Sequence, residues 1–201
     1  MICAAVTVSG CTSKQRYQQI ETEFYNQQIK FSARIEKPEG SGPFPAVVIV
    51  HGSQNHRKDY YNEYSHYFAE NGIVALSYDD RGFADSGGNL WTSDFLDLAT
   101  DLLAAVSYLK SLGYVDEQRI GFWADSHGGW IVLIADSLSQ EIAFIVNKSG
   151  PAVTPLATVL FEKSKRLDSY DLPKVTHDKI LDLYQKMIEY LAGNRSETLL
   201  S

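Results

Sequence analysis

The chain has few cysteines, no long apolar run and no excess of positive charge. Both cysteines, Cys3 and Cys11, lie near the start of the 201-residue sequence, so its body has no thiol for a disulfide framework or a Cys-rich metal site. No stretch approaches the ~18 consecutive apolar residues of a membrane-spanning helix. The net charge of −7 argues against nucleic acid as a partner, because binding it needs a clustered basic surface. The length and the 44% hydrophobic content instead fit a single globular domain.

The N-terminal segment resembles the end of a bacterial lipoprotein signal peptide. Residues 1–11 are mostly small and apolar, and they end in Val-Ser-Gly-Cys11, as in a lipobox. The resemblance implies that Cys11 is acylated and anchors the protein to a membrane surface in the cell envelope. No basic residue precedes the apolar run, so the alternatives are a start further upstream or a chance match in a disordered or strand-forming N-terminus of a cytoplasmic protein. Residues 1–15 are therefore a candidate signal or tether.

Short runs rich in β-branched and aromatic residues predict strands. Apolar and polar residues alternate from Ile29 to Ile35, which is typical of a half-buried strand. The run Ala46–Val50 is continuously apolar, as expected of a strand covered on both faces. Further strands are expected at residues 73–78, 119–124 and 142–146.

Helical spacing of apolar residues lies between these runs. Helices are expected at about residues 60–70, 95–109 and 128–138. The alternating order predicts an α/β fold, with a mostly parallel sheet and helices on both faces, over residues 16–155. Residues 156–201 carry no strand pattern and only helical spacing, around residues 177–192. We expect this segment to be a helical cap that covers the site.

The most specific chemical motif lies at the end of the third buried strand. The residues Ala124-Asp-Ser126-His-Gly128 place a serine between a predicted strand and a predicted helix. This is the nucleophile-elbow pattern G-x-S-x-G, in which a tight, strained turn between small residues projects the serine Oγ. Ala124 in place of glycine adds one methyl group. The competing interpretation is a serine that only caps the helix.

Two further turns follow the other buried strands. The first buried strand ends in His51-Gly-Ser53, where an acyl-transfer enzyme needs a donor to the oxyanion. The backbone N–H groups of Ser53 and His127 are the candidate donors. The glycine-rich turn after the second strand carries acidic residues that would repel a phosphate, so we expect Asp79 or Arg81 to tie that loop to its neighbours.

Together these segments resemble the α/β-hydrolase fold, and within it the bacterial branch similar to serine aminopeptidases, acyl-peptidases and dienelactone hydrolases. The resemblance covers about residues 29–155, including the Asp-Arg-Gly-x-x-x-Ser-Gly turn and the Ser149-Gly-Pro151 end of the fourth strand. It implies a serine hydrolase that cleaves ester or peptide bonds of a small-molecule or peptide substrate, with no metal or organic cofactor. Ser126 carries over as nucleophile, and Ser53 and His127 as backbone donors.

The sequence lacks an obvious base for Ser126. In this fold the acid and then the histidine follow the serine, on loops after later strands. Asp168 or Asp171 with His177 has the correct order, but no strand precedes these residues, and the competing interpretation is a linker in which Thr176 caps a helix. We therefore expect a C-terminally truncated hydrolase that lacks its acid and base.

The alternative is a non-catalytic envelope lipoprotein or binding protein that keeps the hydrolase scaffold. It is motivated by the absent base and by the elbow itself, in which Ala124 replaces a glycine and Asp125 precedes the serine. An Asp125 side chain that pointed into the site would oppose a developing oxyanion.

Overall fold

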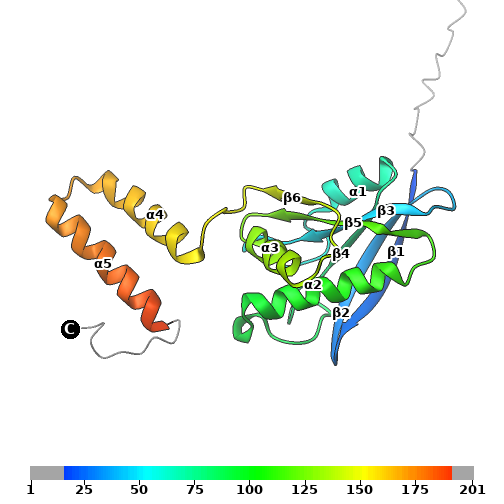
Figure 1. Ribbon diagram of the computed structural model, residues 1–201, viewed down its shortest axis with the longest axis horizontal. Coiled ribbons are helices and arrows are strands. Elements are labelled where there is room, and N and C mark those ends of the chain that lie inside the picture. Colours follow the sequence, from blue (N-terminus) through cyan, green and yellow to red (C-terminus); the bar gives the residue numbers. More distant parts are fainter. Residues whose placement is uncertain (1–15, 192–201) are drawn as a thin grey trace, which may run out of the picture. The chain divides into compact units, whose positions relative to one another are not determined.

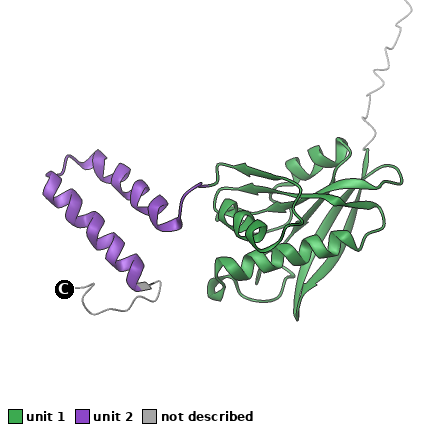
Figure 2. Ribbon diagram, viewed as in Figure 1, with its two compact units in different colours: residues 1–150 green, residues 151–201 purple. Residues whose placement is uncertain are grey.

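A computed structural model describes residues 16–191 of the chain. They belong to two compact units, residues 1–150 and residues 151–201 (Figure 2). The first unit contains the sheet and the elbow, and the second contains only helices. Cys3 and Cys11 lie outside the described residues.

The first unit is built on a six-stranded sheet with the order β1-β2-β4-β3-β5-β6 (Figure 1). The four strands β4, β3, β5 and β6 pair in parallel, whereas β1 and β2 form an antiparallel hairpin that joins the sheet at β4. The predicted α/β fold with a mostly parallel sheet is therefore confirmed. The strand bounds are Tyr17–Asn26 for β1, Ile29–Pro38 for β2, Phe44–Val50 for β3, Val74–Tyr78 for β4, Val115–Asp125 for β5 and Ile145–Lys148 for β6.

Helices cover both faces of this sheet. Helix α1 (Asn62–Glu70) lies on one face, and α2 (Phe95–Lys110) and α3 (Gly128–Leu138) lie side by side on the other (Figure 1). Helix α2 begins with a capping box between Asp94 and Asp97, just after a short 3₁₀ turn, η1, at Leu90–Thr92.

Two apolar clusters hold these layers together. The larger one packs Val48 and Val50 of β3 against α2 and α3, and the smaller one packs Val47 and Ile49 against α1. Successive side chains of a strand point to opposite faces, so a strand between two helical layers must be apolar at every position. This explains the continuous run at Ala46–Val50, all of which is buried.

The strands differ from the predicted ones in several bounds, since β5 begins at Val115 and not at residue 119, and in one additional strand. The sequence pattern did not predict β1, whose side chains are mostly exposed or half-buried, so that it has little apolar periodicity. Strand β6 begins at Ile145 rather than at residue 142, although Ala143 already donates its N–H to Ile120 O at 2.8 Å. Both strands lie at an edge of the sheet, where apolar patterns are weakest.

The second unit has one more helix than the sequence pattern predicted. Helix α4 (Pro155–Leu167) precedes a 3₁₀ turn, η2, at Asp168–Tyr170, and α5 (Lys174–Leu191) begins three residues before the predicted start at His177. The Thr154 Oγ1 accepts the N–H of Ala157 at 3.3 Å, and Pro155 follows at the first helical position. Among the described helices, none is long and apolar enough to cross a membrane.

Glu36 is a carboxylate buried inside the first unit. It lies on β2, is fully shielded from solvent, and has one oxygen, Oε2, without a hydrogen-bond partner. Burial raises the pKa of Glu36 to about 7, although a hydrogen bond from Gln19 and the charge of Arg34 act in the opposite direction. His66 of α1 places its Nε2 3.2 Å from the other oxygen, Oε1.

We expect Glu36 to make the protein less stable as the pH rises. The pKa of Glu36 is higher in the folded state than the ordinary 4.5, because burial favours the protonated form. The stability that the protonated Glu36 gives to the folded state is therefore fully present below pH 4.5 and is lost as the pH rises through about 7. The variant Glu36→Gln, which cannot ionise, should lose that dependence and gain on the order of 2 kcal/mol over the native protein at pH 8. Urea unfolding at pH 5 and pH 8 measures both. The exposed Glu23→Gln is the matched control, and parallel pH curves for Glu36→Gln and the native protein would contradict the assignment.

Candidate active site

Ser126 lies at the turn between β5 and α3. Its φ is +49°, in the left-handed region that non-glycine residues rarely adopt and that costs about 1–3 kcal/mol. Its N–H donates to Lys148 O at 2.9 Å, and its carbonyl accepts the N–H of Gly129 at 2.9 Å. The serine thus has the strained strand-to-helix geometry of a nucleophile elbow.

The residues around this turn are small because other chain segments pass close to them. A Cβ on Gly128 would lie 2.6 Å from His51 O, and one on Gly129 would lie 2.5 Å from Asn147 Oδ1. Ala124 is fully buried. The turn after β3 and the strand β6 therefore press against the elbow from two sides.

The turn after β3 lies against Ser126. A Cβ on Gly52 would lie 3.3 Å from the Ser126 Cβ, so this glycine permits the close approach. The His51 ring is buried and its Nε2 lies 2.8 Å from Tyr78 O, which fixes the turn to the end of β4. In the part of the chain that the structure describes, neither the Ser53 N–H nor the His127 N–H donates to a protein acceptor. Both predicted donors therefore remain available for a ligand.

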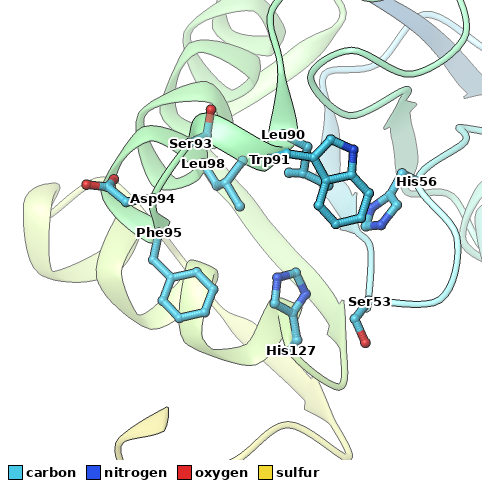
Figure 3. Close-up of a pocket in the computed structure, with 9 residues that line it drawn as sticks. All are labelled: Ser53, His56, Leu90, Trp91, Ser93, Asp94, Phe95, Leu98 and His127. Atoms are coloured by element: carbon cyan, nitrogen blue, oxygen red, sulfur yellow. The ribbon is translucent and has the colours of Figure 1, made fainter. Parts of the chain in front are cut away.

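An apolar cavity of about 460 Å³ opens beside this turn (Figure 3). The loop after β3 contributes Ser53 and His56, and the elbow contributes His127. Figure 3 shows the rings of Trp91, His56, Phe95 and His127 around the cavity. The remaining wall comes from η1 and the start of α2, through Leu90, Ser93, Asp94 and Leu98.

The His127 side chain lines this cavity. Its ring centroid lies 5.6 Å from that of Phe95. Burial lowers the pKa of His127, and the nearby His56 lowers it further, while Asp80 opposes both. The neutral form of the His127 imidazole is therefore favoured at neutral pH.

Arg81 holds the helical wall of the cavity in place. Its guanidinium is buried and forms an ion pair with Asp101 of α2, with Nη2 2.9 Å from Oδ1. It also donates to the Ser93 Oγ at 3.2 Å and to the Asp97 carbonyl at 3.3 Å. The expectation that Arg81 ties its loop to neighbouring elements is confirmed. Asp79 does so too, since its Oδ1 accepts the N–H of Lys58 at 2.8 Å.

The Asp125 side chain does not face this cavity. It lies on the same side of β5 as Trp123, where Oδ2 accepts the Tyr61 hydroxyl at 2.7 Å and Oδ1 accepts Lys148 Nζ at 2.9 Å. Burial alone would raise the pKa of Asp125, but the hydrogen bonds from Lys148 and Tyr61 outweigh it and lower the pKa. Its charge is therefore paired, which removes the objection that Asp125 opposes an oxyanion.

No histidine ring of residues 16–150 hydrogen-bonds to Ser126. In the second unit, His177 Nε2 lies 3.3 Å from Asp168 Oδ1, and Nδ1 lies 3.5 Å from Asp178 Oδ1. Asp171, the other candidate acid, lines the same small surface pocket as His177 but forms no ion pair with it. The other rings of the first unit contact backbone or carboxylate groups, His51 at Tyr78 O, His56 at Asp80 and His66 at Glu36.

Sequence patterns missed three residues that the fold brings to the site. Tyr61 and Lys148 reach Asp125 from distant parts of the chain, and Trp91 comes from a turn without apolar periodicity. One signal was available, because Asp125 lies two positions after Trp123 and must share its face of the sheet. Among the described residues, no group of three His, Cys, Asp or Glu side chains could hold a metal ion.

This geometry agrees with a match to a known family. A family model described as "Serine aminopeptidase, S33" matches residues 41–186, which include the turn after β3 and the elbow. The chain belongs to this hydrolase family. The resemblance to α/β-hydrolases of the serine aminopeptidase branch is therefore confirmed.

Several curated proteins are similar to this chain, and two of those described here are named esterases. The quorum-quenching protein AidA of Acinetobacter baumannii is 26% identical over 70% of this chain and 49% of its own length. Esterase EstD of Thermotoga maritima is 28% identical over 77% of this chain and 38% of its own length. Esterase FrsA of Klebsiella pneumoniae is 32% identical over 59% of this chain and 28% of its own length. The chain thus spans about half or less of the length of these relatives.

Solved structures share the fold of this hydrolase. A hypothetical protein from Pseudomonas aeruginosa has a TM-score of 0.62 at 23% identity, over 78% of this chain and 54% of that one. The Pyrococcus furiosus esterase PF2001 has a TM-score of 0.61 at 22% identity, over 81% of this chain and 60% of that one. At these identities the likeness shows the fold alone.

The tight elbow predicts a large effect for a small substitution. Gly128→Ala places a methyl group against backbone at His51, which cannot swing away, so we expect a loss of about 1–3 kcal/mol in the free energy of unfolding. Gly113→Ala is the control, because nothing lies within 4 Å of its Cβ position. Urea unfolding of both variants measures the difference. Equal stability of the two variants would show that the elbow tolerates a side chain.

Proposed function

We propose that the protein is a serine hydrolase that cleaves carboxylic ester or peptide bonds through an acyl-enzyme on Ser126. The observation that carries the proposal is the left-handed φ of +49° at Ser126, directly between β5 and α3. A serine that only caps a helix has no need of this strain, because residues at that position adopt ordinary extended backbone. The strain instead serves to project the hydroxyl from the turn.

The reaction follows from the groups around Ser126. Its Oγ attacks the carbonyl carbon, and the N–H groups of Ser53 and His127 donate to the resulting oxyanion. Loss of one such donor costs roughly 2.7–4 kcal/mol of transition-state stabilisation. Collapse of the tetrahedral intermediate expels the alcohol or amine and leaves the acyl group on Ser126, and water then releases the acid.

The reaction also needs a base to take the proton of Ser126, with a carboxylate to orient that base. We assign neither role within residues 16–150. His177, with Asp168 or Asp171, remains the candidate pair in the second unit. Since the chain spans about half or less of its curated relatives, the activity of the whole protein is part of the proposal.

We further propose that the cavity beside Ser53 and His127 holds the acyl part of the substrate. Its walls include the apolar side chains of Leu90, Trp91 and Phe95, together with the Asp94 side chain and the His127 imidazole, whose pKa is lowered by burial. Such a site favours an uncharged aliphatic or aromatic acyl group over a carboxylate. Two relatives bear the name esterase, so esters are the first substrates to test.

A fluorophosphonate probe tests the nucleophile. We expect it to label the full-length protein covalently at Ser126, because the probe phosphonylates only activated serines. The variant Ser126→Ala should lose the label entirely, while Ser86→Ala, a serine outside the elbow, should keep it. Mass spectrometry of the labelled peptide locates the adduct. A native protein that stays unlabelled would favour the non-catalytic scaffold.

A series of p-nitrophenyl esters tests the acyl cavity. Each buried CH₂ contributes about 0.8 kcal/mol, or roughly fourfold in kcat/KM, so hexanoate should exceed acetate by more than tenfold. Phe95→Ala should reduce that ratio severalfold, because the ring forms part of the wall. The neighbouring Leu96 is exposed, and Leu96→Ala is the control. An unchanged ratio in Phe95→Ala would place the acyl group elsewhere.

Lipid attachment at Cys11, and with it a location in the cell envelope, stays a prediction from the sequence.

A further inference from the structure

We infer that Tyr61 is a positioning residue, whose hydroxyl sets the two halves of the oxyanion hole relative to each other. The inference rests on the proposed function, in which Ser53 and His127 are the donors. It concerns a residue that no motif of the elbow includes, and that lies in the segment just before α1.

The Tyr61 hydroxyl is joined to the elbow through Asp125. It donates to Asp125 Oδ2 at 2.7 Å, and the side chain of Tyr61 is only 7% exposed. Asp125 directly precedes Ser126, so this bond acts on the residue that leads the chain into the strained turn. The bond therefore restrains the elbow from the face of the sheet opposite to the acyl cavity.

Lys148 closes a ring of contacts around the same turn. Its Nζ donates to Asp125 Oδ1 at 2.9 Å, and its carbonyl oxygen accepts the N–H of Ser126, also at 2.9 Å. The side chain and the main chain of one residue thus hold Asp125 and Ser126 together. Both oxygens of Asp125 are occupied by charge-assisted hydrogen bonds, which are the stronger and more directional ones.

Tyr61 also contacts the other half of the oxyanion hole. The Tyr61 hydroxyl lies next to the backbone of Gly52, and the His51 ring stacks on the Tyr61 ring at a centroid distance of 5.6 Å. A Cβ on Gly52 would lie 3.5 Å from Asp125 Oδ2, so the turn and the carboxylate are immediate neighbours. One hydroxyl therefore connects the residue before Ser53 with the residue before Ser126.

The hydroxyl keeps its proton throughout the working pH range. Burial raises the pKa of Tyr61, and the hydrogen bond to the Asp125 carboxylate raises it further. The group thus donates to Asp125 at every pH at which the carboxylate is ionised, and the link does not switch.

The ring and the hydroxyl of Tyr61 have separate roles. The ring packs against Trp123 at a centroid distance of 5.0 Å, inside the smaller apolar cluster. Tyr61→Phe keeps this packing and removes only the bridge between the two turns. The variant therefore separates positioning from support of the core.

The experiment measures ester hydrolysis and the rate of fluorophosphonate labelling in the full-length protein. For Tyr61→Phe we expect kcat and the labelling rate to fall about tenfold, with KM within twofold of the native value, because displaced donors weaken binding of the transition state more than of the substrate. Tyr60→Phe is the matched control, since its hydroxyl reaches only Gln54, at 3.5 Å, and it should match the native protein.

A double-mutant cycle tests whether Tyr61 acts through Asp125. Asp125→Ala should lower kcat by at least as much as Tyr61→Phe, and the double variant should lose no more than Asp125→Ala alone. If the loss of kcat in the double variant equals the product of the two single losses, Tyr61 does not act through Asp125 and the link is overturned. Thermal unfolding checks that each variant is folded. If Asp125→Ala does not fold, the comparison of Tyr61→Phe with Tyr60→Phe is the test.

The outcomes distinguish this inference from the proposed function. If the native protein is labelled at Ser126 and Tyr61→Phe keeps the native kcat, the positioning role is wrong while the nucleophile stands. A rise in KM with unchanged kcat would also overturn it, because that pattern indicates lost substrate binding. If the native protein is neither labelled nor active, the proposed function fails and the inference fails with it.

Discussion

The close approach of β3 to the start of α3 is the constraint on which the site depends. The carbonyl of His51 lies where a side chain on Gly128 would be, so the strand end and the helix start meet with no room between them. This contact brings the turn that contains Ser53 next to the residue that follows the strained serine. Because both are backbone segments of a packed sheet and helix, the fold brings the two N–H groups close together, and the role inferred for the buried Tyr61 hydroxyl is to fix them there.

The charged residues around the elbow act at a distance from the proposed chemistry. Asp125 would be harmful if it faced an oxyanion, but it is turned to the opposite side of β5 and paired with Lys148 and Tyr61. Arg81 similarly forms an ion pair with Asp101, and its hydrogen bond to Ser93 holds the wall of the acyl cavity in place. The walls of the cavity are mainly apolar, and its polar lining residues are Ser53, His56, Ser93, Asp94 and His127. Paired charges on the outside and a weakly polar interior suit an uncharged acyl group.

Part of this site followed from the sequence because it depends on local rules. Ala124 and Gly128 are the small residues that a strand-to-helix turn requires on either side of Ser126, and the structure contains that turn with Ser126 at a positive φ. The continuous apolar run in β3 likewise required a strand between two helical layers. Edge strand β1 was missed, because a strand with one open edge and polar side chains has no strong pattern.

The sequence alone determined the order of strands and helices from β2 to β6 and the position of the elbow, since both depend on residue spacing and on steric room within a few positions. It did not determine where side chains point. Only the tertiary structure decided that His127 lines a cavity, that Asp125 faces away from it, and that Tyr61 joins the two turns. These arrangements depend on contacts between residues far apart in the chain, such as Tyr61 and Asp125 at a separation of 64, which no local pattern records.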